Sequence, residues 1–187
     1  MRPALLKFQK AGVRQIEEFD GVVLLADQMG LGKTAQSLYW AANYLPDNAK
    51  IVIICPASLK INWQREARKF CGLRAVILSG LTPPNEDVLN YGRVFIFNYD
   101  ILVNRAGQKN SWLTLIRKLK PDLVICDECH MIKSLKAKRT KAVREICKKV
   151  KHKIMISGTP LTNRPAELFS ALNILHPKEF PSFVSFG

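Results

Sequence analysis

The segment Asp27-Gln-Met-Gly-Leu-Gly-Lys-Thr34 combines residue types that hold phosphate groups. A glycine-rich turn before a helix lets consecutive backbone N–H groups close around phosphate oxygens. Lys33 would reach the β- and γ-phosphates of a nucleotide, and the Thr34 hydroxyl would hold Mg²⁺. Asp27 stands where the pattern GxxxxGK[ST] has its first glycine, so a helix start with a surface lysine stays an alternative. The expected nucleotide-binding residues here are Met29, Gly30, Leu31, Gly32, Lys33 and Thr34.

An acidic pair, Asp127 and Glu128, directly follows the apolar run Leu123–Cys126. Asp127 can hold a metal ion through its water shell, and Glu128 is placed to orient and deprotonate an attacking water. Mg²⁺ needs few protein ligands beside phosphate oxygens, so one hydroxyl and one carboxylate suffice. As an alternative, Asp127 is a helix cap and Glu128 a first-turn acid that complements the helix dipole. Lys33, Asp127 and Glu128 are the predicted catalytic residues, expected on neighbouring strands.

Six short apolar runs alternate with amphipathic stretches along the chain. They lack strict alternation, which is typical of strands covered on both faces. Strand–helix alternation predicts an α/β fold with a mainly parallel sheet and helices on both sides. Ligands bind such sheets beyond the carboxyl ends of the strands. The predicted strands are Val22–Ala26, Ile51–Cys55, Arg74–Leu78, Val94–Phe97, Leu123–Cys126 and Ile154–Ser157.

The chain is strongly basic, with 29 Lys and Arg against 15 Asp and Glu among 187 residues and a formal net charge of +14. Nucleic acid is the simplest partner for this excess, because Lys and Arg that neutralise phosphates release counterions; solubility is the alternative. The basic segment Lys133–Lys153 fits a DNA-facing ridge or a solvated helix face equally well. No apolar run is long enough to span a bilayer and no secretory signal is evident, which favours an intracellular protein.

The tryptophans and the CxxC cysteines are interpreted as structural residues and not as functional ones. Trp40, Trp63 and Trp112 fall within helical patterns and are expected in the core. Cys126 and Cys129 form a CxxC without a second pair at zinc-ligand spacing, so the spacing is taken as incidental. Loops are expected at 82–91 and 104–110, where prolines or glycine interrupt the periodic pattern.

An ordered series of motifs resembles the superfamily 2 helicases, and within them the Swi/Snf-type DNA-translocating ATPases. The segments at 27–34 and 127–130 are similar to motifs I and II of that family. Leu6-Lys-Phe-Gln9 is similar to the adenine-reading segment, and Ser157-Gly-Thr-Pro-Leu-Thr-Asn163, followed by Glu167-Leu168, is similar to motif III. Cys55-Pro-Ala-Ser-Leu59, continuing to Trp63 and Glu66, resembles motif Ia, and Phe97-Asn-Tyr-Asp100 resembles motif Ib. The resemblance implies that motifs Ia and Ib line the DNA track. Gln28 and Cys129 depart from the usual pattern at positions that carry no chemistry. The end of the chain most resembles the annealing-helicase branch that remodels replication forks.

The resemblance implies a RecA-like P-loop NTPase fold of three layers, with residues 1–187 forming the first of two lobes. The second lobe, with its arginine fingers, would be missing from this chain. ATP and Mg²⁺ would be bound, with Gln9 on the adenine. The partner would be double-stranded or branched DNA, in the nucleus or in the nucleoid and cytoplasm. The residues implied to contact DNA or couple it to ATP are Ser58, Asn98, His130, Ser157 and Thr159.

Two other functions stay open at this point. A P-loop switch or kinase would use the same phosphate loop on small molecules or proteins, without the Gln9 segment or the Ser157-Gly-Thr-Pro element. A non-catalytic module would bind ATP or DNA without turnover, although Lys33, Asp127 and Glu128 favour an enzyme. DNA-stimulated ATP hydrolysis separates the translocase from both.

Overall fold

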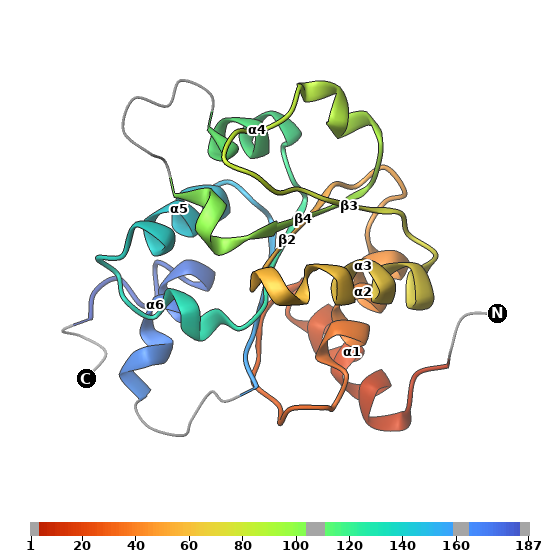
Figure 1. Ribbon diagram of the computed structural model, residues 1–187. Helices are drawn as coiled ribbons and strands as arrows, with labels where there is room; N and C mark the ends of the chain where they lie inside the picture. The colour runs from red at the N-terminus through yellow and green to blue at the C-terminus, as the bar shows by residue number, and fades with distance from the viewer. Residues whose placement is uncertain (1–3, 104–110, 159–164, 184–187) are drawn as a thin grey trace.

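A single all-parallel sheet of six strands organises the protein (Figure 1). The computed structural model describes residues 4–103, 111–158 and 165–183. The strand order is β1-β6-β5-β2-β4-β3. Each predicted strand is present, with ends moved by at most two residues, so the α/β prediction is confirmed. The strands are β1 Val22–Leu25, β2 Ile51–Cys55, β3 Ala75–Ile77, β4 Val94–Asn98, β5 Leu123–Cys126 and β6 His152–Ile156.

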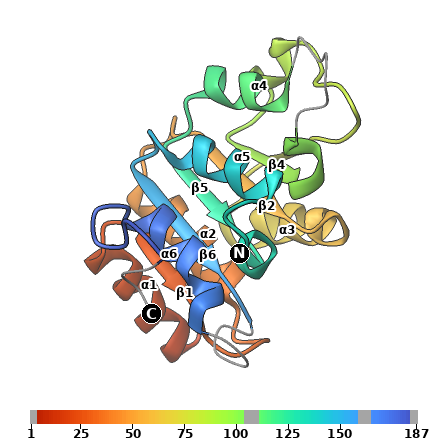
Figure 2. The ribbon, with the colours of Figure 1, turned by 90° about the vertical axis from the view of Figure 1, so that its left-hand side faces the viewer.

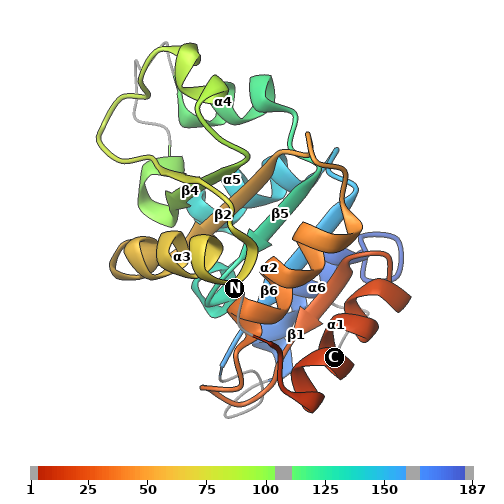
Figure 3. The same ribbon diagram turned by 90° about the vertical axis from the view of Figure 1, so that its right-hand side faces the viewer.

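Helices cover both faces of the sheet and complete three layers. The face with α1, α2 and α3 lies toward the viewer in Figure 3, and α5 and α6 lie in front of the sheet in Figure 2. Each face has its own buried apolar cluster, one built with α1 to α3 and the other with α4 to α6. The helices are α1 Lys7–Glu18, α2 Lys33–Tyr44, α3 Lys60–Glu66, α4 Trp112–Leu119, α5 Lys138–Cys147 and α6 Phe169–Leu175.

The central strands are buried along their whole length. Every residue of β2, β4 and β5 is buried, because helices pack on both faces of these strands. Complete burial removes the apolar–polar alternation of a half-exposed strand. The edge strand β1 is different, since buried residues alternate with half-buried ones. The sequence patterns therefore reflect position in the sheet.

The three tryptophans lie in the core, as predicted. Trp40, Trp63 and Trp112 are exposed by 1%, 0% and 2% respectively. Trp40 and Trp63 belong to the cluster beneath α1 to α3, and Trp112 packs edge-on against Phe97 on the opposite face. Trp63 also has a polar contact, described below, which the sequence did not predict.

All five cysteines are buried thiols. Cys55 and Cys71 lie in the cluster beneath α1 to α3, and Cys126, Cys129 and Cys147 lie in the cluster on the other face. Burial, aided by the nearby Asp127 charge, raises the pKa of Cys55 to about 12. Burial, with the Glu128 charge next, also raises the pKa of Cys129 to about 12. These thiols therefore stay protonated at neutral pH.

The remaining segments refine the sequence predictions. The loop expected at 82–91 contains a short 3₁₀ helix, Glu86–Asn90, and the loop expected at 104–110 lies outside the described residues. In the basic segment, α5 buries Val143, Ile146 and Cys147 and leaves its lysines exposed. Within the described ranges, no helix is both long and apolar enough to cross a membrane.

The turn from α1 into β1 depends on Gly21, whose φ is +68°. An added Cβ would lie 2.2 Å from Cη2 of the buried Trp40 ring. We therefore expect Gly21→Ala to lower the free energy of unfolding by about 2–5 kcal/mol, through left-handed strain and overpacking together. Urea unfolding measures this loss. Gly80→Ala is the control, because Gly80 also has a positive φ but its nearest atom would be 3.9 Å away; equal losses in the two variants would contradict the steric argument.

Candidate active site

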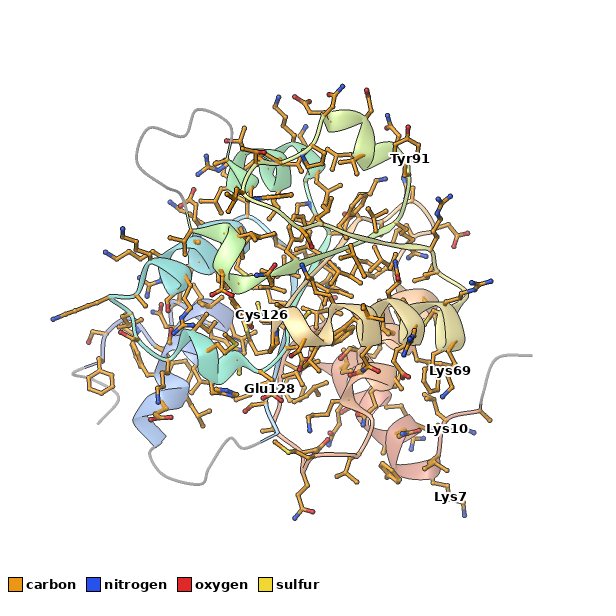
Figure 4. All side chains as sticks on the ribbon, viewed as in Figure 1. Lys7, Lys10, Lys69, Tyr91, Cys126 and Glu128 are labelled. Carbon is orange, nitrogen blue, oxygen red and sulfur yellow. The ribbon has the colours of Figure 1, made fainter. Side chains whose placement is uncertain are left out.

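The two predicted motifs meet at one edge of the sheet. The phosphate loop follows β1 and the acidic pair follows β5, and in a parallel sheet both strands end at the same edge. The expectation that they lie on neighbouring strands is wrong, because β6 runs between β1 and β5. The predicted motif III residue Ser157 directly follows β6 and therefore lies between the two motifs. Figure 4 labels Cys126 and Glu128 where β5 ends.

The loop from 27 to 32 has the backbone conformation that an anion cradle requires. Gly30 and Gly32 have φ values of +83° and +73°, and Gly32 caps the start of α2. A Cβ on Gly30 would meet no described atom within 4 Å, so this side of the loop is open. The Lys33 ammonium is largely buried and donates to the carbonyl oxygens of Asp27 at 2.6 Å and Gln28 at 2.9 Å. The cation thus lies inside the loop, where a phosphate would meet it.

Gln9, the predicted adenine-contacting residue, lies against the same loop. Its Oε1 accepts a hydrogen bond from the backbone N–H of Leu6 at 3.0 Å, and its Nε2 donates to the Leu31 carbonyl at 3.4 Å. The buried Gln36 also donates to the Leu31 carbonyl, at 3.1 Å. Sequence reasoning missed Gln36, although a glutamine on the buried face of a helix requires such a partner. The contact of Gln9 with adenine stays a prediction.

Asp127 is held by two hydrogen bonds to its carboxylate. Oδ1 accepts from the backbone N–H of Glu128 at 2.9 Å, and Oδ2 accepts from Nε1 of Trp63 at 2.8 Å. Burial raises the pKa of Asp127, and the Trp63 hydrogen bond and the Lys33 charge oppose this rise. A carboxylate oxygen accepts more than one hydrogen bond, so each oxygen keeps a lone pair for a metal ion or its water.

Glu128 has a strained backbone and a carboxylate oxygen that lies beside the imidazole of His130. Its φ is +49°, a left-handed conformation that costs a non-glycine residue about 1–2 kcal/mol. Oε2 is buried without a hydrogen-bond donor among the described residues, and it lies 3.2 Å from Nδ1 of His130. The alternative of a helix cap is not supported. Glu128 directly precedes the 3₁₀ turn Cys129–Ile132 and its side chain makes no capping hydrogen bond, while Asp127 accepts from the N–H of Glu128, outside the turn. A buried oxygen that lacks a donor is suited to accept a proton.

These residues fit a nucleotide with its magnesium ion. The loop supplies an open anion cradle with a cation inside it, and Thr34, the second residue of α2, is half-buried beside Lys33. Across β6, Asp127 supplies a carboxylate with oxygen lone pairs, the ligand type that Mg²⁺ prefers. The Lys33 charge opposes the burial-driven rise in the pKa of Asp127, so the ammonium and the carboxylate lie within electrostatic range of each other.

The predicted DNA-contacting and coupling residues are in different environments. Ser58 is exposed in the 3₁₀ turn Ala57–Leu59, and the His130 side chain is 48% exposed. Asn98 is buried, with Oδ1 accepting from the Lys60 ammonium at 3.0 Å and Nδ2 near Asp100 at 3.4 Å. Ser157 is buried. Thr159 lies outside the described residues, and the roles of all five stay predictions.

Two aromatic residues that contact Asp127 were not predicted as site residues. Trp63 was expected in the core and in the continuation of motif Ia, and Tyr99 lies within the motif Ib segment, but neither was expected to contact Asp127. Tyr99 is buried and donates its hydroxyl to the Asp127 carbonyl oxygen at 2.7 Å. Burial raises the pKa of Tyr99 well above its usual value, so the hydroxyl remains a donor. The available signal was that buried indole and phenol groups need hydrogen-bond partners.

Curated proteins similar to this chain regulate chromatin or act on DNA. The chain is 36% identical to the Caenorhabditis elegans homolog of SWI/SNF-related matrix-associated actin-dependent regulator of chromatin subfamily A-like protein 1, over 100% of this chain and 27% of that protein. It is 30% identical to bovine DNA annealing helicase and endonuclease ZRANB3, over 100% of this chain and 17% of that protein. The chain thus spans about a quarter or less of these relatives.

A solved structure and a family profile support the same relationship. The SWI2/SNF2 ATPase core of Sulfolobus solfataricus in complex with dsDNA superposes with a TM-score of 0.81 and 26% identity, covering 100% of this chain and 38% of that chain. The RecA-like fold prediction is thereby confirmed. The profile of the SNF2-related domain matches residues 8–187. Because that match takes in nearly the whole chain, the protein belongs to the SNF2-related family.

Proposed function

We propose that this chain is the ATP-binding lobe of a DNA-dependent ATPase that moves along double-stranded DNA. The main support is the convergence of an open anion cradle holding Lys33 with the buried Asp127 and the half-buried Glu128 at one edge of the sheet. The neighbouring solved structure is titled as a complex with dsDNA, and ZRANB3 is named an annealing helicase. More specifically, we propose that the protein acts on branched DNA at replication forks. Because this DNA is inside the cell, the proposal includes an intracellular location.

Each site residue has a defined task in ATP hydrolysis. The loop N–H groups and Lys33 bind the phosphates, and Thr34 and Asp127 would hold Mg²⁺, which would neutralise phosphate charge. Glu128 orients a water and takes its proton as the water oxygen attacks the γ-phosphorus. The bond from the γ-phosphorus to the ADP oxygen breaks, releasing ADP and phosphate. Oε2 of Glu128, which accepts no hydrogen bond among the described residues and lies 3.2 Å from Nδ1 of His130, is the acceptor suited to that proton.

A second RecA-like lobe would complete this site. An arginine finger is worth about 10³–10⁵ in rate in related phosphoryl-transfer sites. The described residues around the site supply one cation, Lys33, inside the loop. We therefore propose that the 187-residue chain binds ATP and hydrolyses it slowly unless the second lobe is present.

DNA-stimulated hydrolysis is the decisive test of this function. In a protein that carries both lobes, duplex DNA should raise the ATP turnover rate. Adding an unrelated protein that is free of nucleic acid should leave that rate unchanged. A P-loop switch or kinase would show nucleotide binding with no response to DNA. Turnover that is equal with and without duplex or branched DNA would contradict the translocase.

Binding of duplex DNA should weaken steeply with salt. Each neutralised phosphate contributes about −0.9 to the slope of log K against log salt, so two phosphates give about a tenfold loss between 50 and 200 mM. The net charge of +14 and the exposed Ser58 turn support contacts of this kind. Fluorescence anisotropy with a labelled duplex at several salt concentrations measures the slope. A flat profile would argue against contacts to the phosphate backbone.

A further inference from the structure

Two buried donors converge on Asp127 from the segments that the family resemblance places beside DNA. Nε1 of Trp63, on α3, donates to the carboxylate Oδ2 at 2.8 Å. The hydroxyl of Tyr99, which directly follows β4, donates to the main-chain carbonyl at 2.7 Å. Both aromatic side chains are fully buried, with 0% exposure. Trp63 is 64 residues away from Asp127 in sequence and Tyr99 is 28 away.

The sheet order explains why both donors reach Asp127 from one side. Strand β5, which directly precedes Asp127, is followed across the sheet by β2 and then β4. The chain after β2 forms α3 with Trp63, and the chain after β4 begins with Tyr99. On its other side, β5 pairs with β6, beyond which lie β1 and the phosphate loop. Asp127 is thus held from the β2–β4 side, while the side toward Lys33 remains for the nucleotide.

We propose that Trp63 and Tyr99 are positioning residues, which hold Asp127 in the orientation that binds the magnesium ion of the nucleotide. This inference rests on the proposed function of the site. The Trp63 hydrogen bond fixes the rotation of the carboxylate, and the Tyr99 hydrogen bond fixes the backbone that carries it. Partners that orient a metal ligand are worth about 10- to 100-fold in metal affinity. Neither aromatic residue contacts the ion itself.

A simple packing role for Trp63 is the alternative, and Trp112 allows the two to be separated. Trp112 is also buried, at 2% exposure, and it lies on the opposite face of the sheet. Its Nε1 has no hydrogen-bond partner among the described residues. Trp→Phe at either position removes an indole and leaves a similar void. Only at Trp63 does the substitution remove a donor to Asp127.

The test is the magnesium dependence of ADP binding by Trp63→Phe and Trp112→Phe. Isothermal titration measures ADP affinity in EDTA and then across a series of Mg²⁺ concentrations. For Trp63→Phe, we expect the half-saturating Mg²⁺ concentration to rise about 10- to 100-fold, with ADP affinity in EDTA unchanged. Trp112→Phe should match wild type in both measurements. Tyr99→Phe removes a single oxygen atom and should shift the Mg²⁺ dependence in the same direction by less.

Several outcomes would overturn the proposal. Wild-type Mg²⁺ dependence in Trp63→Phe excludes a positioning role, as does an equal shift in both tryptophan variants. Should Trp63→Phe fail to fold, an unshifted Tyr99→Phe rejects the role for the pair. If the unmodified chain binds ADP neither in EDTA nor in Mg²⁺, the proposed function fails together with this role. That failure is recognisable because it precedes any substitution.

Discussion

Replacing Lys33 with alanine should weaken ATP binding by at least about 100-fold. Lys33 would donate to both the β- and the γ-phosphate, and each charge-assisted hydrogen bond is worth about 1.5–3 kcal/mol. Two such bonds are worth at least about 3 kcal/mol, and about 2.7 kcal/mol already corresponds to a factor of 100. The Lys33 ammonium lies inside the loop, hydrogen-bonded to the carbonyls of Asp27 and Gln28, so its substitution removes the positive charge from the place where the phosphates would bind. Binding of a fluorescent ATP analogue to the 187-residue chain measures the loss.

The matched control for this prediction is Lys149→Ala. Lys149 is exposed and precedes β6, at the edge of the sheet opposite the site. Lys149→Ala removes one positive charge from the chain, as Lys33→Ala does. Comparing the two variants therefore separates the loss of the phosphate contact from the effect of net charge on the affinity for an anionic ligand. Circular dichroism checks that both variants are folded. An ATP affinity that is the same in Lys33→Ala as in Lys149→Ala would refute the assigned phosphate site.

Glu128→Gln should leave ATP bound but lower the turnover rate by about 10²–10⁴, which is the usual contribution of a general base. The amide has nearly the same shape as the carboxylate but cannot take a proton from water. Single-turnover hydrolysis should be measured in a protein that carries both lobes, with duplex DNA present, alongside ATP affinity. Glu145→Gln is the control, because Glu145 pairs with Arg117 on the exposed surface. Normal turnover in Glu128→Gln would remove Glu128 as the base.

The sequence predicted the strands well because their signal is local. Runs such as Ile51–Cys55 and Leu123–Cys126 are apolar without alternation, and the structure buries every residue in them. The start of α2 at Lys33 was also predicted, since glycines before a lysine define a phosphate loop and its helix. Both features depend on neighbours in the chain, and the family resemblance supported the same reading.

The spatial arrangement of the motifs was harder to predict. Nothing local to Val22–Leu25 or Leu123–Cys126 shows that β6, formed later in the chain, lies between them. That order depends on how the crossover connections pack. The polar contact of Trp63 was missed for a related reason, because a hydropathy pattern treats tryptophan as apolar and its acceptor on Asp127 is distant in sequence. The enclosure of Asn98 by Lys60 and Asp100 is also a product of tertiary packing.

Because buried cysteines lie under both helical layers, the rate at which each thiol is labelled can report local opening of the layer that covers it. Cys55 and Cys71 lie under one helical layer, and Cys126, Cys129 and Cys147 lie under the other. A thiol-alkylating reagent reaches each sulfur only when the covering layer moves away, so labelling rates follow the opening equilibria. Mass spectrometry of peptides labelled over time would then reveal which layer loosens first, and whether nucleotide or DNA slows that loosening on one side of the sheet.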